Sequence, residues 1–177
     1  MGKQAQGGFT LVEALATLGI SLTALVAAVS GFGGQMHKRH AEGVAAELAT
    51  DLQFVRTEAV MRNRGVRVSF GSDDAGARCY VIHTGPAAAC SCSGDGPAVC
   101  TGDAAEIKTV NFPNGGRTLV QANVSSMYYD PARATVSPTA TIRVVSADGR
   151  ELRHIVNILG RVRSCAASGQ WAGHGPC

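Results

Sequence analysis

The sequence predicts an α+β protein in which a long N-terminal helix packs on an antiparallel β-sheet and disulfides hold the loops. Apolar residues recur at helical spacing from near the start of the chain to about residue 63. The spacing then changes to the alternation that is typical of strands, with turn residues between the runs. The 177 residues suffice for one domain with an N-terminal appendage. All six cysteines follow residue 78, which indicates an oxidising compartment for the C-terminal part.

The first part of the helix is almost free of charge. Residues 9–32 contain one ionisable side chain, that of Glu13. Roughly 20 apolar residues are needed for a helix to cross the hydrocarbon of a membrane, and this segment provides them. We therefore expect a transmembrane helix over residues 9–33, with the cysteine-containing domain outside the cytoplasm.

The second part of the helix is amphipathic. It should continue from near Gln35 to about Asn63, with charged residues between the apolar ones. Its apolar stripe should form one wall of a globular domain over residues 34–177. The stripe consists of Ala41, Val44, Ala45, Leu48, Leu52, Val55 and Ala59.

Short strands should follow the helix. Asp148-Gly149, between two alternating runs, is the strongest hairpin signal in the chain. The expected strands cover residues 66–70, 78–84, 107–112, 117–122, 126–130, 141–147 and 151–158.

A long loop over residues 85–102 lacks strand periodicity and needs disulfides to hold it. Four thiolates in this region could bind a metal, but their C-x-C spacing is unlike the C-x₂-C pairs of structural zinc sites, so we expect disulfides and no metal. In the C-terminal tail we expect a Cys165–Cys177 bond, because little else would hold that glycine-rich segment. Within the loop, Cys92–Cys100 and Cys90–Cys100 are equally good alternatives.

The sequence does not resemble that of an enzyme. The five histidines are scattered, and no nucleophile elbow, phosphate-binding loop or zinc-protease motif occurs. His37 and His40 share a helix face, yet beside Lys38 and Arg39 they fit a solvated polar surface better than a metal site. We expect a non-enzymatic protein without a cofactor.

The segment LGRVRSC carries the clearest binding signal. In an extended chain Arg161 and Arg163 lie on one face, roughly 6–7 Å apart, which is close to the spacing of adjacent phosphates along a nucleic-acid strand. Gly160 leaves room for the approach of a backbone. The alternative is a pair of arginines on a solvated strand that bind nearby carboxylates.

The N-terminal GGFTLVE followed by an apolar helix resembles the class III leader of type IV pilins and type II secretion pseudopilins. The resemblance implies a leader over residues 1–8, cleavage after Gly8 by a prepilin peptidase, and N-methylation of Phe9. It also implies that Glu13 pairs with the Phe9 amine of a neighbouring subunit during filament assembly. The protein would then span the inner membrane once, with a periplasmic C-terminal domain that becomes extracellular in the pilus.

Two further segments narrow the resemblance to the GspH/FimT group of minor pilins and pseudopilins. ATDLQFVRTEAVMRN is similar to the corresponding helix of that group, and Gly160-Arg161-Val162-Arg163 is similar to the GRxR motif of FimT-type minor pilins. This motif implies DNA binding in natural transformation, with Arg153 as a further candidate contact. Trp171 is the only nearby aromatic residue, so we expect phosphate contacts with little sequence preference. The alternative function is that of a structural pseudopilin in type II secretion.

Overall fold

The computed structural model describes residues 9–72, 78–93, 96–112, 118–168, 171 and 173–177, without the side chains of residues 27–33, 72 and 78. The chain forms two compact units, Met1–Met36 and His37–Cys177. Helix α1 (Leu11–Met61) is continuous and contributes to both units. The expected leader, residues 1–8, lies outside the described residues.

Thr10 caps the start of α1 in the N-terminal unit. The backbone N–H of Glu13 donates to the Thr10 hydroxyl at 3.3 Å, and Ala14 N–H donates to the Thr10 carbonyl at 3.2 Å. Glu13 therefore lies in the first turn of the helix. The large apolar side chains that the structure describes in this unit are exposed: Phe9, Leu11, Val12, Leu15, Leu18, Ile20, Leu22, Leu25, Val26 and Met36.

Within the described ranges, no helix combines the length and the apolar character that crossing a membrane requires. The expected span over residues 9–33 includes residues 27–33, whose side chains are outside those ranges.

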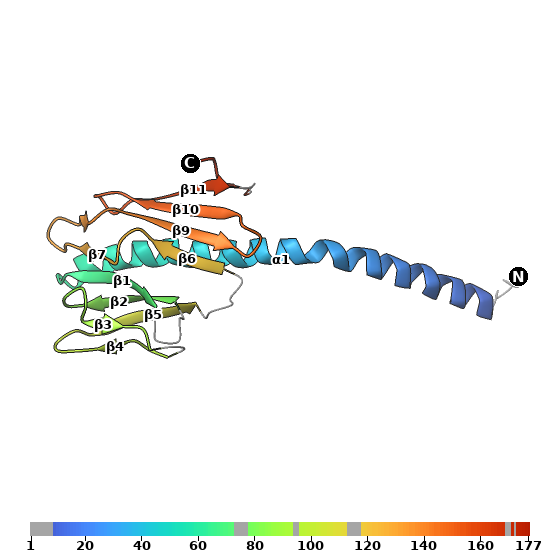
Figure 1. The fold of residues 1–177 in the computed structure, drawn as a ribbon, viewed down its shortest axis with the longest axis horizontal. Coiled ribbons are helices and arrows are strands. Elements are labelled where there is room, and N and C mark those ends of the chain that lie inside the picture. The colour runs from blue at the N-terminus through green and yellow to red at the C-terminus, as the bar shows by residue number, and fades with distance from the viewer. Residues whose placement is uncertain (1–8, 73–77, 94–95, 113–117, 169–170, 172) are drawn as a thin grey trace, which may run out of the picture. The chain divides into compact units, whose positions relative to one another are not determined.

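The C-terminal unit contains two antiparallel sheets and a short hairpin (Figure 1). One sheet has the order β5 (Glu106–Phe112), β2 (Arg78–Thr84), β1 (Val66–Ser72), β7 (Ser126–Tyr129) and β8 (Val136–Ser137). The second has the order β11 (Val162–Ser168), β10 (Glu151–Val156), β9 (Ala140–Ser146) and β6 (Thr118–Ala122). The hairpin pairs β3 (Cys90–Ser91) with β4 (Val99–Cys100).

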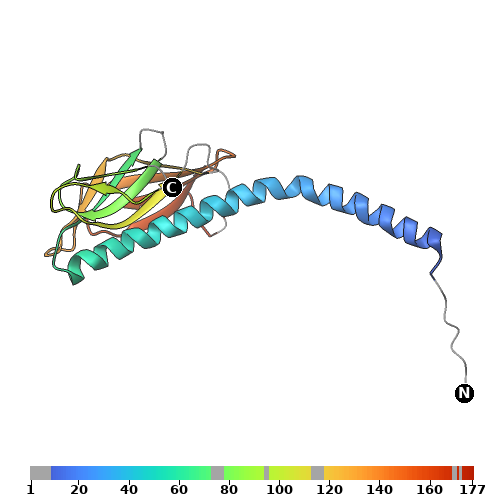
Figure 2. The same ribbon diagram turned by 90° about the horizontal axis from the view of Figure 1, so that it is seen from below.

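Both sheets pack on the same helix. Figure 2 shows the C-terminal half of α1 along one side of the strands. The buried helix residues are Ala41, Ala45, Leu48, Leu52, Val55 and Ala59, and they share one core with residues of both sheets. The predicted α+β class is confirmed, but the strands form two sheets instead of one. Alternation predicts a strand but not which strands lie beside it. The chain passes from the first sheet to the second at β6, returns for β7 and β8, and passes again to the second at β9.

The β9–β10 hairpin turns at Asp148-Gly149, where Gly149 has a φ of +82° that suits glycine. Strands β3, β4 and β8 were not expected, because two residues are too few to show alternation.

Three disulfides hold the C-terminal unit. Cys165 bonds to Cys177, the pair favoured from the sequence, and Cys90 bonds to Cys100. Cys92 bonds to Cys79 in β2, so the alternative Cys92–Cys100 is wrong. Strand pairing places Cys90 directly opposite Cys100, which leaves Cys92 to reach the neighbouring sheet.

Candidate functional site

The turn between β10 and β11 holds the predicted binding motif. The Asn157 side-chain oxygen accepts a hydrogen bond from the backbone N–H of Arg161 at 3.0 Å. Gly160 N–H donates to the Asn157 carbonyl at 2.9 Å, and Asn157 N–H donates to the Arg161 carbonyl at 3.2 Å. Because β11 begins at Val162, Arg161 belongs to this tied turn and only Arg163 lies in a strand.

Gly160 is required by the shape of the turn. Its φ is +69°, a conformation that costs other L-residues roughly 1–2 kcal/mol. A Cβ at this position would lie 3.2 Å from Arg56 Cδ and 3.3 Å from Val136 Cγ2. The space that the sequence left open for a ligand backbone is thus filled by the protein's own helix residue, Arg56.

Arg161 and Arg163 are exposed. Among the described residues, neither has a carboxylate within 4.0 Å. Their guanidinium groups can therefore bind an external anion without first losing an ion pair to a described carboxylate.

Other arginines of the C-terminal third are already paired. Glu151 accepts two hydrogen bonds from Arg143, at 2.9 and 2.7 Å, and one from Arg153 Nε at 2.6 Å. Arg150 pairs with Asp148 at 2.7 Å. The charge of Arg153, the further candidate contact, is thus partly compensated by Glu151. The charges of Arg161 and Arg163 are not compensated by any described carboxylate.

Glu151 should make the stability of the domain depend on pH. Hydrogen bonds from Arg143, and then from Arg153, lower the pKa of Glu151 to about 2 despite its burial. A carboxylate with a depressed folded-state pKa stabilises the protein above its unfolded-state pKa, and this contribution is lost as pH falls from about 4.5 to about 2.

We expect Glu151→Gln to lower the free energy of unfolding at neutral pH and to approach wild-type stability near pH 2. Urea unfolding followed by circular dichroism across this pH range measures the difference. Parallel pH profiles of the two proteins would contradict the assignment.

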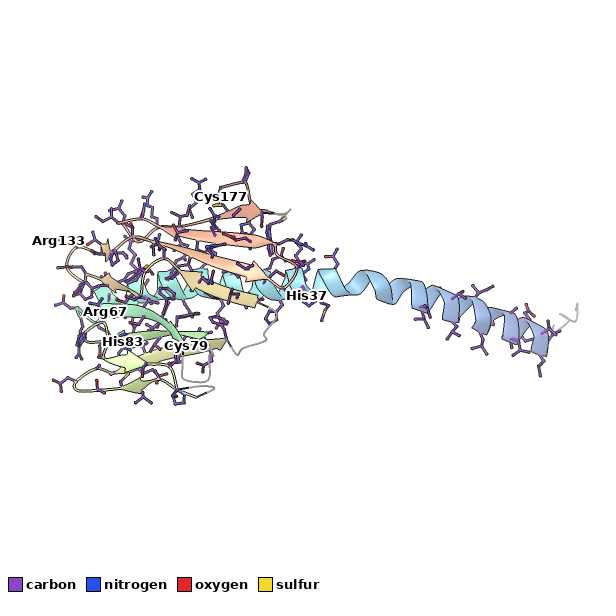
Figure 3. The ribbon with its side chains drawn as sticks, viewed as in Figure 1. His37, Arg67, Cys79, His83, Arg133 and Cys177 are labelled. Carbon is purple, nitrogen blue, oxygen red and sulfur yellow. A yellow bond between two sulfur atoms is a disulfide. The ribbon has the colours of Figure 1, made fainter. Side chains whose placement is uncertain are left out.

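Arginines from three segments gather at one end of the C-terminal unit. The end of α1 leads directly into β1, Val66 pairs with Tyr129 of β7, and Val136 N–H donates to the Ile158 carbonyl at 2.8 Å. Figure 3 shows Arg67 and Arg133 at this end and His37 at the opposite end of the unit. We call this surface the arginine-rich end; its members are Arg56, Arg62, Arg64, Arg67, Arg133, Arg161 and Arg163.

The same three segments, residues 56–67, 130–136 and 157–163, contain only two carboxylates, Glu58 and Asp130. Glu58 binds Arg62, and Asp130 lies 4.0 Å from the largely exposed Arg133. Positive charge therefore exceeds negative charge within these three segments, although Asp103 of a neighbouring segment lines a hollow together with Arg64. No local pattern predicts this grouping, because residue 56 lies about a hundred positions before the GRVR motif.

Trp171 lies in the core and not on the surface. Its side chain is 4% exposed, it packs with the main cluster, and its indole N–H donates to the Ser168 carbonyl at 3.1 Å. It is not available to stack on a base. This burial leaves charge, not aromatic stacking, as the basis for binding near the turn.

The two helix histidines lie at the start of the C-terminal unit. His40 Nδ1 is 2.8 Å from the Thr118 hydroxyl. Across the described ranges, no group of three or more His, Cys, Asp or Glu side chains is placed to hold a metal ion.

Comparison with known proteins gives one family and one fold. The family described as "Type II transport protein GspH" matches residues 44–160, more than half of the chain. A crystal structure of the type IV minor pilin FimU from Pseudomonas aeruginosa (strain PAO1) matches with a TM-score of 0.50 and 18% identity, covering 71% of this chain and 87% of that chain. A second crystal form of FimU matches with a TM-score of 0.45 and 18% identity, covering 70% and 90%. No curated protein matches the chain.

Proposed function

Because the chain belongs to the GspH family of type II transport proteins and shares the fold of a minor pilin, we propose that it binds DNA through Gly160-Arg161-Val162-Arg163 and aids DNA uptake in natural transformation. It acts without enzymatic chemistry, as a filament subunit beside other pilins or pseudopilins. The inner membrane anchors it through residues 9–33, and the C-terminal domain lies in the periplasm until assembly exposes it.

One observation carries the DNA-binding proposal. Arg161 and Arg163 are exposed at the arginine-rich end and have no carboxylate partner within the described residues. In contrast, Arg143 and Arg153 both form ion pairs with Glu151. Guanidinium groups bind phosphate oxygens in bidentate fashion, and such contacts carry little sequence information. The protein is thus suited to capture DNA of any sequence.

The test is a salt titration with the full-length chain in dodecyl maltoside. Fluorescence anisotropy with two short duplexes of unrelated sequence should give similar affinities. The logarithm of the affinity should fall with the logarithm of the salt concentration, with a slope of at least about 1.8 from two phosphate contacts. Absence of binding at low salt would reject the proposal.

A structural role in type II secretion is the second candidate, and the same turn favours it in one respect. Ile158 and Leu159 at the tip are 60% and 49% exposed, and apolar side chains there suit a contact with another protein subunit. In that case DNA binding would be absent, and changes at the tip would impair secretion.

Processing gives an independent prediction. The sequence GGFTLVE implies that the mature chain begins with N-methylated Phe9. Intact-mass measurement of the protein from a membrane or filament fraction should show loss of residues 1–8 and the mass of one added methyl group. An intact leader in cells with an active prepilin peptidase would contradict this processing.

Glu13 should be needed for filament assembly. A carboxylate in an apolar setting is costly unless it is paired, and the Phe9 amine of a neighbouring subunit would provide the cation. Glu13→Val should lower incorporation into sheared filaments while membrane-fraction levels stay at wild-type values. Thr10→Ala removes the nearby helix cap but keeps the carboxylate, so it serves as the control. Normal incorporation of Glu13→Val would exclude the assembly role.

A further inference from the structure

A hollow lies between α1 and the β10–β11 turn. It measures about 440 Å³ and is lined by Gln53, Arg56 and Thr57 from the helix and by residues 160–162 from the turn. None of the described carboxylates lines it. Its two charged members, Arg56 and Arg161, come from opposite walls.

Contact with Gly160 positions the Arg56 side chain. The missing Cβ of Gly160 would lie 3.2 Å from Arg56 Cδ and 3.6 Å from Arg56 Nε. The aliphatic stem of Arg56 therefore passes closely over the glycine. Its guanidinium group is held beside the turn that carries Arg161, which lowers the entropy lost on binding a ligand.

The charge of Arg56 is not compensated by a carboxylate. Among the described residues, no Asp or Glu lies within 4.0 Å of it; the nearby Glu58 binds Arg62 instead. Arg56 and Arg161 are both exposed and line the same hollow, so an anion that enters it meets positive charge from both walls. The hollow is therefore matched to a ligand of negative charge with several acceptor oxygens.

We propose that Arg56 is a third phosphate-binding residue and that one phosphodiester group of a DNA strand enters this hollow between Arg56 and Arg161. This inference rests on the proposed DNA-binding function and adds a helix residue to a site otherwise confined to the turn. A phosphodiester has the charge and the oxygen acceptors that two guanidinium forks require. Gly160 then serves two purposes, since it allows the turn and admits the stem of Arg56.

The test compares Arg56→Gln with wild type in the full-length chain in dodecyl maltoside, by anisotropy with a fluorescein-labelled duplex. Loss of Arg56 from the shared phosphate should lower the salt slope by up to the roughly 0.9 of one phosphate contact, which corresponds to binding up to about eightfold weaker at roughly 0.1 M salt. Arg39→Gln removes the same charge from an exposed helix position beside Glu42, and it should leave the slope unchanged. Thermal unfolding by circular dichroism verifies that each variant is folded.

A double-mutant cycle tests whether the two arginines share one phosphate. If they do, Arg56→Gln should weaken binding less in the Arg161→Gln background than in wild type. Strictly additive losses would overturn the shared site. Displacement of the labelled duplex by polyglutamate would also overturn the shared site, if it occurs as readily as with unlabelled DNA of the same total charge. That result would indicate a surface that binds any polyanion.

The outcomes separate this inference from the function on which it rests. If wild type binds DNA and Arg161→Gln weakens it while Arg56→Gln does not, the helix residue is excluded and the proposed function stands. If wild type does not bind DNA even at low salt, the proposed function itself is wrong.

Discussion

A chain that carries both Arg161→Gln and Arg163→Gln should bind duplex DNA about sixtyfold more weakly than wild type at roughly 0.1 M salt. Each phosphate contact contributes about 0.9 to the salt slope, so the loss of two should flatten it by about 1.8. Both side chains are exposed and lack carboxylate partners among the described residues, so the fold should not change. Anisotropy at several salt concentrations measures the slope.

The matched control removes two positive charges elsewhere. Arg39 and Arg150 each lie beside a carboxylate, so Arg39→Gln with Arg150→Gln gives the same formal charge change away from the turn. This control should retain nearly the wild-type slope. Equal slopes for both double variants would mean that net charge, and not the turn, determines binding.

Trp171→Ala should have the largest effect on stability, a loss of about 3–5 kcal/mol in the free energy of unfolding. The side chain is 4% exposed and packs in the main core, so its removal leaves a cavity and removes the hydrogen bond from the indole N–H to the Ser168 carbonyl. Urea unfolding of the oxidised protein, followed by circular dichroism, measures the loss. Intrinsic tryptophan fluorescence cannot follow the unfolding of this variant, because Trp171 is the only tryptophan in the chain.

Ile158→Ala is the control for Trp171→Ala, since Ile158 is 60% exposed and should change stability by no more than about 0.5 kcal/mol. Below its unfolding temperature, Trp171→Ala should keep the DNA salt slope, because the indole does not face the ligand. If the folded Trp171→Ala variant binds DNA without the salt dependence of wild type, the C-terminal tail that contains Trp171 takes part in binding.

The helix and its core face could be predicted because one pattern determines both. Residues at three- and four-residue spacing face one side, and Leu48, Leu52 and Val55 of the predicted stripe are buried. The strands were found for the same reason. Their division into two sheets could not be found, since pairing depends on packing over the helix and not on the alternation within a strand.

Charge was harder to predict than burial. Six arginines follow residue 132, but Glu151 alone binds two of them, and a count along the sequence cannot reveal such pairing. Arg56 was missed for the opposite reason. It belongs to an ordinary polar helix face, and only the folded chain brings it to Gly160.

The disulfide-bonded tail also affects how the domain meets other protein molecules. β11 is the outer strand of its sheet, and such edges can pair with strands of other molecules. At Ala166 the edge is closed, because its N–H donates to the Gly175 carbonyl at 2.8 Å and its carbonyl accepts from Cys177 N–H at 3.0 Å. The Cys165–Cys177 bond holds this cover in place. Oxidation thus helps to keep this part of the β11 edge from pairing with a strand of another molecule.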